Sequence, residues 1–235
     1  MADEQGEACH LPRESYVQAI MVALASKSVK TARRSASPRS RQTGAVQQVP
    51  RPLPPPQPFR FTVKDYYRLG EIGILKEDDR VELIQGEIVM MPPIDPGHAE
   101  STHHSYRKLD RCLEEQYQVR SQHPVRLNAS SEPVPDVSIV RAKSYKSGHP
   151  TAEDTLLIVE VSNTSLKDDL GRKKLMYAAA GIPEYWVVDL NARVLHVFAR
   201  PKGGDYLDHH IHEEKETVQS ITLKPLKLKV AELLP

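Results

Sequence analysis

The 235-residue sequence has little cysteine and no apolar run long enough to cross a membrane. Its two cysteines, Cys9 and Cys112, lie far apart, which argues against both a disulfide framework and a zinc site. Scarce cysteine fits the reducing cytoplasm. The apolar stretch 17–25 is too short for a membrane span, and it follows acidic residues rather than the basic residues that open a secretory signal. We therefore expect a cytoplasmic protein with no membrane partner.

The chain after residue 58 also lacks an excess of positive charge. Residues 1–58 carry eight Lys and Arg against four Asp and Glu, whereas residues 59–235 carry 24 against 27, a net of −3. A slightly acidic domain is not a bulk nucleic-acid binder, so any contact with phosphate requires a local basic patch. The basic loop 141–150 offers Arg141, Lys143 and Lys146, although a solvated loop is the favoured interpretation.

Residues 1–58 are predicted to form a tail without a core. Basic residues occur among serines and threonines with no acid between Lys27 and Arg41, and six prolines follow between Pro50 and Pro58. This composition predicts disorder followed by a stiff linker. A basic arm that touches nucleic acid is one interpretation. The favoured one is a dispensable tail, or sequence upstream of a true start such as Met21. The folded domain is predicted to span residues 59–235.

The most informative stretch runs from Thr155 to Asp189 and predicts a buried strand, a helix and a second strand. Its first apolar run is typical of a strand covered on both faces, yet Glu160 lies in the middle of it. A lone buried carboxylate is costly unless it is paired or bound to a metal. In the helix, Lys173 lies on the apolar stripe, three residues after Leu170 and four before Tyr177. Lys173 is therefore expected to face the sheet.

Two further acids occur in predicted strands. Asp136 stands directly before a short apolar strand over 137–140, and Glu82 lies in a hairpin of two short strands around Gly86. A glutamate in such a hairpin usually faces solvent, so only its context would give it a function.

Histidines offer weaker signals. His98 begins a helix predicted over 98–118 and is placed near a site. After residue 189 the chain is predicted to be all β, and His210 and His212 would share one face of an exposed hairpin with His209 on the other. A polar strand face is favoured there over a metal site.

Asp136, Glu160 and Lys173 together suit metal-assisted phosphodiester hydrolysis. Two carboxylates at the ends of neighbouring strands provide oxygen ligands for Mg²⁺ or Mn²⁺. Such a cation binds a phosphate oxygen and lowers the pKa of a bound water, and a lysine can orient that water and balance charge. A purely structural salt bridge between Glu160 and Lys173 is an equally good interpretation of the spacing.

The same segments carry a resemblance to a known family. Residues 133–140 (PVPDVSIV) and 156–189 (LLIVEVSNTSLKDDLGRKKLMYAAAGIPEYWVVD), with 81–93 (VELIQGEIVMMPP) before His98, resemble the large bacterial Uma-two family of restriction endonucleases. That family belongs to the PD-(D/E)XK nuclease superfamily. The resemblance covers about residues 60–230, and the tail has no counterpart in it.

The motif matches residue by residue, with one departure. Asp136 follows Pro135 as in the PD element, and Glu160 matches the (D/E). The superfamily lysine would stand two residues after the glutamate, where this chain has Ser162. In the resembled family a D-x-G-x-K-x-x-x-Y pattern in the next helix supplies the lysine, and it is matched here by Asp169, Gly171, Lys173 and Tyr177.

The resemblance implies both a fold and an activity. The fold is α/β, with a central mixed β-sheet in the restriction-endonuclease style, flanking helices and a β-rich C-terminal part. The activity is a Mg²⁺- or Mn²⁺-dependent endonuclease acting on DNA, with a homodimer as its assembly. Asp136 and Glu160 would bind the metal, Lys173 would serve the water, and Glu82 would assist from the hairpin. The alternative is a catalytically silent nucleic-acid-binding or dimerisation module that retains a relic of the site.

Overall fold

The structure, a computed structural model, describes residues 57–235. The predicted tail of residues 1–58 lies outside the described residues except for its last two positions, so its interpretation stays a prediction. Residues 58–235 form one compact unit. Within the described part of the chain, no helix has the length and apolar character needed to span a membrane.

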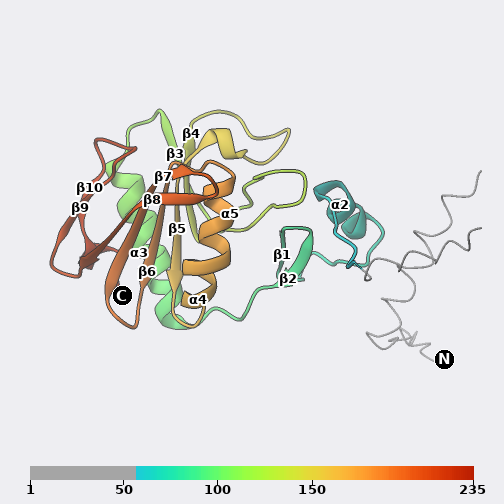
Figure 1. The fold of residues 1–235 in the computed structure, drawn as a ribbon, viewed down its shortest axis with the longest axis horizontal. Helices are drawn as coiled ribbons and strands as arrows, with labels where there is room; N and C mark the ends of the chain where they lie inside the picture. Colours follow the sequence, from blue (N-terminus) through green and yellow to red (C-terminus); the bar gives the residue numbers. More distant parts are fainter. Residues whose placement is uncertain (1–56) are drawn as a thin grey trace, which may run out of the picture. The chain divides into compact units, whose positions relative to one another are not determined.

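A six-stranded sheet forms the centre of this unit, in the order β3-β4-β5-β6-β7-β8 (Figure 1). Strands β5 and β6 are parallel, and the other neighbours are antiparallel, so the sheet is mixed as predicted. The strands are β3 (Tyr117–Ser121), β4 (Val137–Arg141), β5 (Thr155–Ser162), β6 (Glu184–Asp189), β7 (Val194–Lys202) and β8 (Asp205–Glu213).

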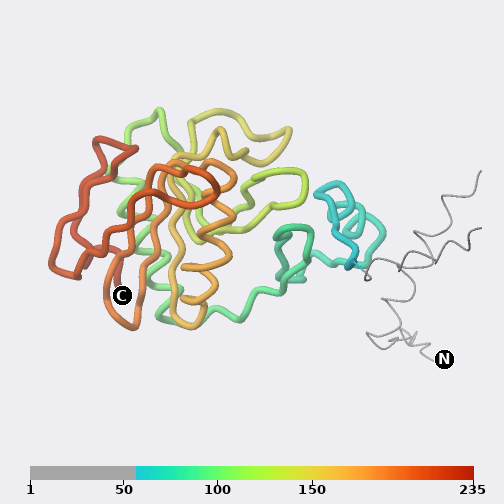
Figure 2. Tube along the Cα trace, in the orientation of Figure 1, coloured from blue at the N-terminus to red at the C-terminus, as the bar shows by residue number. Residues whose placement is uncertain are grey.

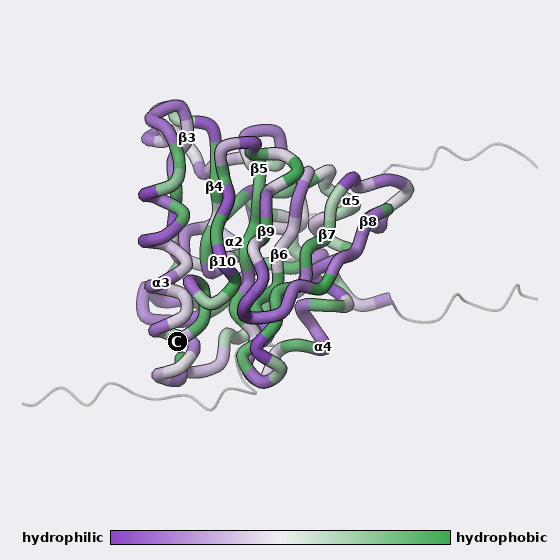
Figure 3. Tube along the Cα trace, turned by 90° about the vertical axis from the view of Figure 1, so that its left-hand side faces the viewer, coloured by the Kyte–Doolittle hydropathy of each residue, from purple (hydrophilic) through white to green (hydrophobic). Residues whose placement is uncertain are grey.

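Every residue of β5 and of β6 is buried, which explains the nearly continuous apolar sequence of these central strands. Figure 3 shows apolar residues gathered along the middle of the sheet. Two parallel neighbours need a crossover connection, and the chain between β5 and β6 forms it as a helical segment, which can be followed in Figure 2. This segment consists of α4 (Leu166–Asp168), the π-helical turn η2 (Asp169–Lys173) and α5 (Lys174–Ala179).

Helices cover both faces of the sheet, with α3 on one side and α4 and α5 on the other (Figure 1). The α3 side is closed further by the C-terminal elements, and its core includes Leu109, Trp186 and Leu233. The α5 side has a core around Ile158, Tyr177 and Tyr185. The elements of the first side are α3 (Pro96–Cys112), β9 (Thr217–Gln219), β10 (Lys227–Lys229) and η3 (Val230–Glu232).

The predicted hairpin is present as β1 (Val81–Ile84) paired with β2 (Glu87–Met90). Its turn residues Gln85 and Gly86 both have positive φ, 50° and 78°, which is the geometry of a two-residue turn matched to strand twist. A Cβ at position 86 would lie 2.7 Å from Cβ of Arg60, so this turn requires glycine. Before the hairpin, α2 (Val63–Glu71) begins with a capping box of Thr62 and Asp65.

The helix predicted over 98–118 is shorter at its carboxyl end than predicted. Helix α3 ends at Cys112, Leu113 is extended, and Tyr117 already belongs to β3. Glu114 and Glu115 would place two acids at the end of the helix, where the helix dipole disfavours negative charge. Cys112 is half-buried against the core, as expected.

Candidate active site

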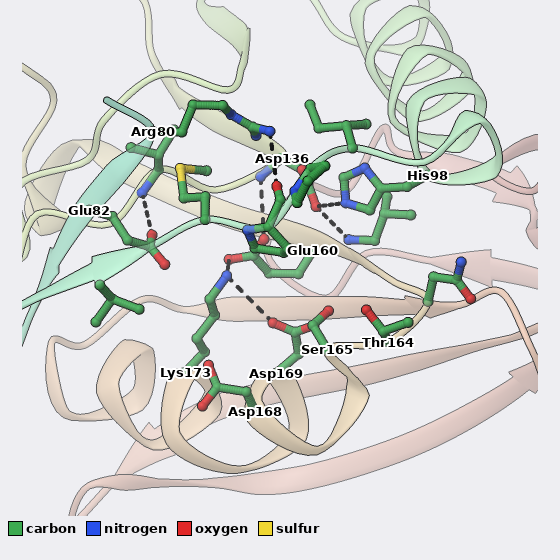
Figure 4. Close-up of a pocket in the computed structure, with 18 of the residues that line it drawn as sticks. Arg80, Glu82, His98, Asp136, Glu160, Thr164, Ser165, Asp168, Asp169 and Lys173 are labelled. Carbon is green, nitrogen blue, oxygen red and sulfur yellow. Dashed lines mark hydrogen bonds and ion pairs between the residues drawn. The ribbon is translucent and has the colours of Figure 1, made fainter. Parts of the chain in front are cut away.

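Glu160 extends from the middle of β5 toward the α4–α5 side of the sheet (Figure 4). Its side chain is almost fully buried, and both carboxylate oxygens accept hydrogen bonds. Oε1 accepts hydrogen bonds from the Tyr177 hydroxyl at 2.8 Å and from Nζ of Lys173 at 3.1 Å. Oε2 accepts a longer one, 3.3 Å, from the backbone N–H of Asp136. The buried carboxylate of Glu160, which would be costly if unpaired, therefore has Lys173 and Tyr177 as partners.

Asp136 lies beside Glu160 because of the register between β4 and β5. Val137 pairs with Val159, so the next residues outward, Asp136 and Glu160, are neighbours across the strands. Oδ2 of Asp136 accepts the backbone N–H of Val161 at 2.9 Å and lies 3.1 Å from Nε2 of His98. The structure thus brings together the two carboxylates that the sequence selected as metal ligands.

Lys173 comes from the π-helical turn η2 and points toward Glu160 rather than solvent (Figure 4). Its second carboxylate is Oδ1 of Asp169 at 3.5 Å. This orientation agrees with the helical stripe, which predicted that Lys173 faces the sheet, whereas the next residue, Lys174, forms an ion pair with Asp205. π-Helical turns occur frequently at functional sites.

Asp169 also belongs to the site, although from the sequence it was noted only as the first residue of the motif that contains Lys173. It is buried, and Oδ2 accepts hydrogen bonds from the hydroxyls of Ser162 and of Ser165, the latter at 2.6 Å. Through this hydrogen bond Ser162 ties β5 to the turn that carries Lys173. Two features of the sequence point to Asp169: it stands in the helical motif that contains Lys173, and Ser162 in the preceding strand can donate a hydrogen bond to it.

Glu82 is buried, contrary to the solvent-facing position that is usual for a hairpin glutamate. Its Oε2 accepts the backbone N–H of Val134 at 3.0 Å, two residues before Asp136. Strand β1 therefore lies against the segment that leads into β4, and this contact turns Glu82 toward the site.

A cleft of about 150 Å³ connects these side chains. It is bounded by β1 and β2, the start of α3, the ends of β4 and β5, and η2. All four residues selected from the sequence line it, together with six further charged or titratable side chains. The full set is Arg80, Glu82, Asp95, His98, Asp136, Glu160, Asp168, Asp169, Arg172 and Lys173.

The electrostatics of the cleft are dominated by crowded carboxylates. Burial raises the pKa of Glu160 to about 8; Lys173 opposes the shift, while Asp136 and Asp169 add to it. Burial acts to lower the pKa of Lys173, but the surrounding carboxylates outweigh it and raise that pKa, so the ammonium stays charged. The hydrogen bond with Asp136 raises the pKa of His98. The cleft is thus short of positive charge.

The donor set fits a hard divalent cation. Mg²⁺ binds oxygen ligands, keeps several waters and is usually held by only one or two protein carboxylates, which Asp136 and Glu160 can supply. Across residues 57–235, no three His, Cys, Asp or Glu side chains are arranged as a metal-binding group. On β8 the ring of His209 stacks on Phe198, with centroids 4.2 Å apart, and the polar face predicted for His210 and His212 stays a prediction.

Comparisons with known proteins agree with the fold. A family model described as "Putative restriction endonuclease" (Uma2) matches residues 63–231. No curated protein matches the chain. A solved structure, that of "a putative nuclease belonging to DUF820 from Anabaena variabilis ATCC 29413", has a TM-score of 0.59 and 14% identity, and the match covers 74% of this chain and 97% of that chain.

At 14% identity the structural likeness shows a shared α/β fold, which confirms the fold class predicted from the sequence. The family match is broader evidence, because it extends from the first residue of α2 through the hairpin, the paired carboxylates and Lys173 to the last helical turn. The chain therefore belongs to the Uma2 family, whose restriction-endonuclease-like motifs its sequence resembles.

Proposed function

We propose that this protein is a Mg²⁺-dependent endonuclease that hydrolyses DNA phosphodiester bonds with an activated water molecule. The observation that carries the proposal is the meeting of Asp136, Glu160 and Lys173 in one cleft, with Nζ of Lys173 3.1 Å from Oε1 of Glu160. Family membership supports a nuclease. The cation, the DNA substrate and the mechanism are what we add.

Asp136 and Glu160 would hold the cation, here Mg²⁺ or Mn²⁺. When bound, such an ion supplies Lewis acidity and lowers the pKa of a coordinated water. Glu160 has Oε2 free of strong hydrogen bonds, because Tyr177 and Lys173 both bind Oε1. Tyr177 and Lys173 therefore fix the orientation of this carboxylate and leave its other oxygen for a ligand.

Lys173 would orient the attacking water and stabilise the negative charge that develops during the reaction. Its ammonium is held between Glu160 and Asp169 before any substrate arrives, and a preorganised cation stabilises negative charge as it forms on a phosphoryl oxygen. Glu82 faces the same cleft from the hairpin and would assist by orienting water at the opposite wall.

Plasmid nicking with Mg²⁺ or Mn²⁺ tests this function. Glu160→Gln and Lys173→Ala should each lower the rate at least about 100-fold, as for loss of a preorganised catalytic group. Lys174→Ala, one residue further along and paired with Asp205 at the surface, is the matched control and should cut at the wild-type rate. Equal cutting by all variants would overturn the proposal.

We also propose that the enzyme acts in the cytoplasm as a homodimer. Each chain offers one such cleft in the part that the structure describes, and cutting both strands of a duplex in one encounter requires two. Light scattering after size-exclusion chromatography tests the assembly, and a mass of one chain at assay concentration would overturn it.

A further inference from the structure

A cluster of cationic and aromatic side chains lies next to the cleft, on β3 and on the loop that follows β4. We call Arg120, Lys143 and Tyr145 the β3 patch. The guanidinium carbon of Arg120 is 5.5 Å from the centroid of the Tyr145 ring, and Nζ of Lys143 is 5.3 Å from the same centroid. The Tyr145 hydroxyl donates to the backbone oxygen of Arg141 at 2.7 Å, so the ring that carries both cations is itself fixed.

The β3 patch lies on the same face of the sheet as the proposed metal ligands. Arg120 pairs with Ser138, and Ser138 pairs with Ile158. Because alternate residues of a strand share a face, Ile158 lies on the side of Glu160. Two residues beyond Arg120, Gln122 lines the cleft and its Nε2 is 3.5 Å from Oδ1 of Asp136. Arg120 is thus about 7 Å along the strand from the cleft wall, about two nucleotide steps of a DNA strand.

Arg120 has no carboxylate within ion-pair distance among residues 57–235, and its Nε is buried without a hydrogen-bond partner. Lys143 differs, since Asp154 binds its Nζ at 2.5 Å. A buried guanidinium nitrogen without a partner is costly. Nε itself is closed to solvent, but the Arg120 side chain as a whole is only half-buried, so its uncompensated charge can still meet an anion from outside.

The neighbouring cations differ from Arg120 in being compensated. Arg126 is paired with the buried carboxylate of Glu132 at 2.6 Å, and burial lowers the pKa of His149, which favours its neutral form. In a domain whose net charge is −3, Arg120 is therefore the local positive charge that binding to phosphate requires.

We propose that the β3 patch is a binding subsite for the phosphate groups of a DNA strand leaving the cleft, with Arg120 as the principal ligand. The inference rests on the proposed function for its substrate class. Arginine suits the role because its planar guanidinium can donate two parallel hydrogen bonds to a phosphate. Tyr145 holds the guanidinium in place.

Fluorescence anisotropy with a labelled duplex, measured without divalent cation so that no strand is cut, tests the subsite. Arg120→Gln should weaken DNA binding about tenfold and reduce the slope of log affinity against log salt by about one. Arg120→Lys should recover part of the affinity. Arg107→Gln removes an exposed arginine from α3, on the opposite face of the sheet, and should bind as the wild type does. Thermal melting shows whether each variant is folded.

The outcomes separate the subsite from the nuclease activity. If Arg120→Gln is folded and binds DNA with unchanged affinity and salt slope, the subsite is wrong. If the wild-type protein binds no DNA, both proposals are wrong. If binding depends on Arg120 but the protein cuts no DNA with Mg²⁺ or Mn²⁺, the subsite stands and the proposed endonuclease does not.

Discussion

The ammonium nitrogen of Lys173 lies 3.1 Å from Oε1 of Glu160, inside a cleft that also contains Asp136. The two interpretations left open by the sequence, a structural ion pair and a catalytic pair, share this contact. They differ in what surrounds it. A structural pair needs no further acids, whereas here Asp136, Asp169 and Glu82 crowd the same space and add to the rise that burial causes in the pKa of Glu160. That surplus of carboxylates favours a site that takes up a cation.

Removing either member of the buried pair should destabilise the protein. Above pH 8, where Glu160 is ionised, Lys173→Met leaves this carboxylate without its cation and should cost about 3 kcal/mol. The double variant with Glu160→Gln should cost at least about 1 kcal/mol less than the sum of the single variants. Urea unfolding can be followed by the fluorescence of Trp186, the single tryptophan of the chain. Lys174→Met, which breaks a surface pair, should cost less than about 1 kcal/mol. Additive single effects would show that the pair is not coupled.

The stability of the metal-free protein should depend on pH through Glu160. Its pKa rises from an ordinary 4.5 to about 8 on folding, so between these values the folded state binds more protons than the unfolded state. The stabilisation is complete below pH 4.5 and is lost as the pH rises through 8, by up to about 1.4 kcal/mol per pH unit. The difference in unfolding free energy between wild type and Glu160→Gln should fall across this window. A difference that is constant from pH 5 to 8 would contradict the burial argument.

Ser162→Ala should weaken the support of Lys173 without removing any charged group. It deletes the buried hydroxyl that donates to Oδ2 of Asp169, at a cost of about 1–2 kcal/mol. If the enzyme cuts DNA, kcat should fall by less than in Lys173→Ala, with KM unchanged. Ser165→Ala removes the other donor to the same oxygen and serves as the matched variant. A kcat at the wild-type value in both would show that Lys173 needs neither serine.

Glu82→Gln should weaken Mg²⁺ binding severalfold, because it removes one of the negative charges of the cleft. Its amide oxygen can still accept the N–H of Val134, so stability should change by less than about 1 kcal/mol. Glu87→Gln, in the same hairpin but half exposed and paired with Arg60, is the control. Isothermal titration with Mg²⁺ measures both, and equal affinities would remove Glu82 from the site.

Glu184→Gln should lower the stability of the protein without changing its affinity for Mg²⁺, because Glu184 is a buried acid with a structural role. Glu184 accepts from Nε1 of Trp186 at 2.7 Å, the hydroxyl of Ser220 at 2.6 Å and the N–H of Thr222 at 2.9 Å. An amide N–H₂ facing these donors should cost about 2–3 kcal/mol. Mg²⁺ affinity should not change, since Glu184 lies on the α3 side of the sheet and not in the cleft. Reduced Mg²⁺ affinity in the folded variant would contradict this division.

The sequence by itself determined the central strand–helix–strand segment. An apolar run broken by Glu160 and a helical stripe interrupted by Lys173 are local patterns, and their periods of two and 3.6 residues specify which face each side chain takes. The hairpin turn at Gly86 and the inward direction of Lys173 followed from such patterns, whereas the mixed sheet was expected from the family resemblance. The length of α3 did not, because the helix competes at its end with the pairing of β3.

Only the tertiary structure decided which side chains meet. The contact of His98 with Asp136 joins residues 38 positions apart, and that of Glu82 with the N–H of Val134 joins residues 52 apart. Periodicity assigns a face but not the register between strands, and here the register of β4 against β5 placed Asp136 beside Glu160. The burial of Glu82 and the pairing of Arg120 with Tyr145 likewise depend on how separate segments pack, which no local pattern records.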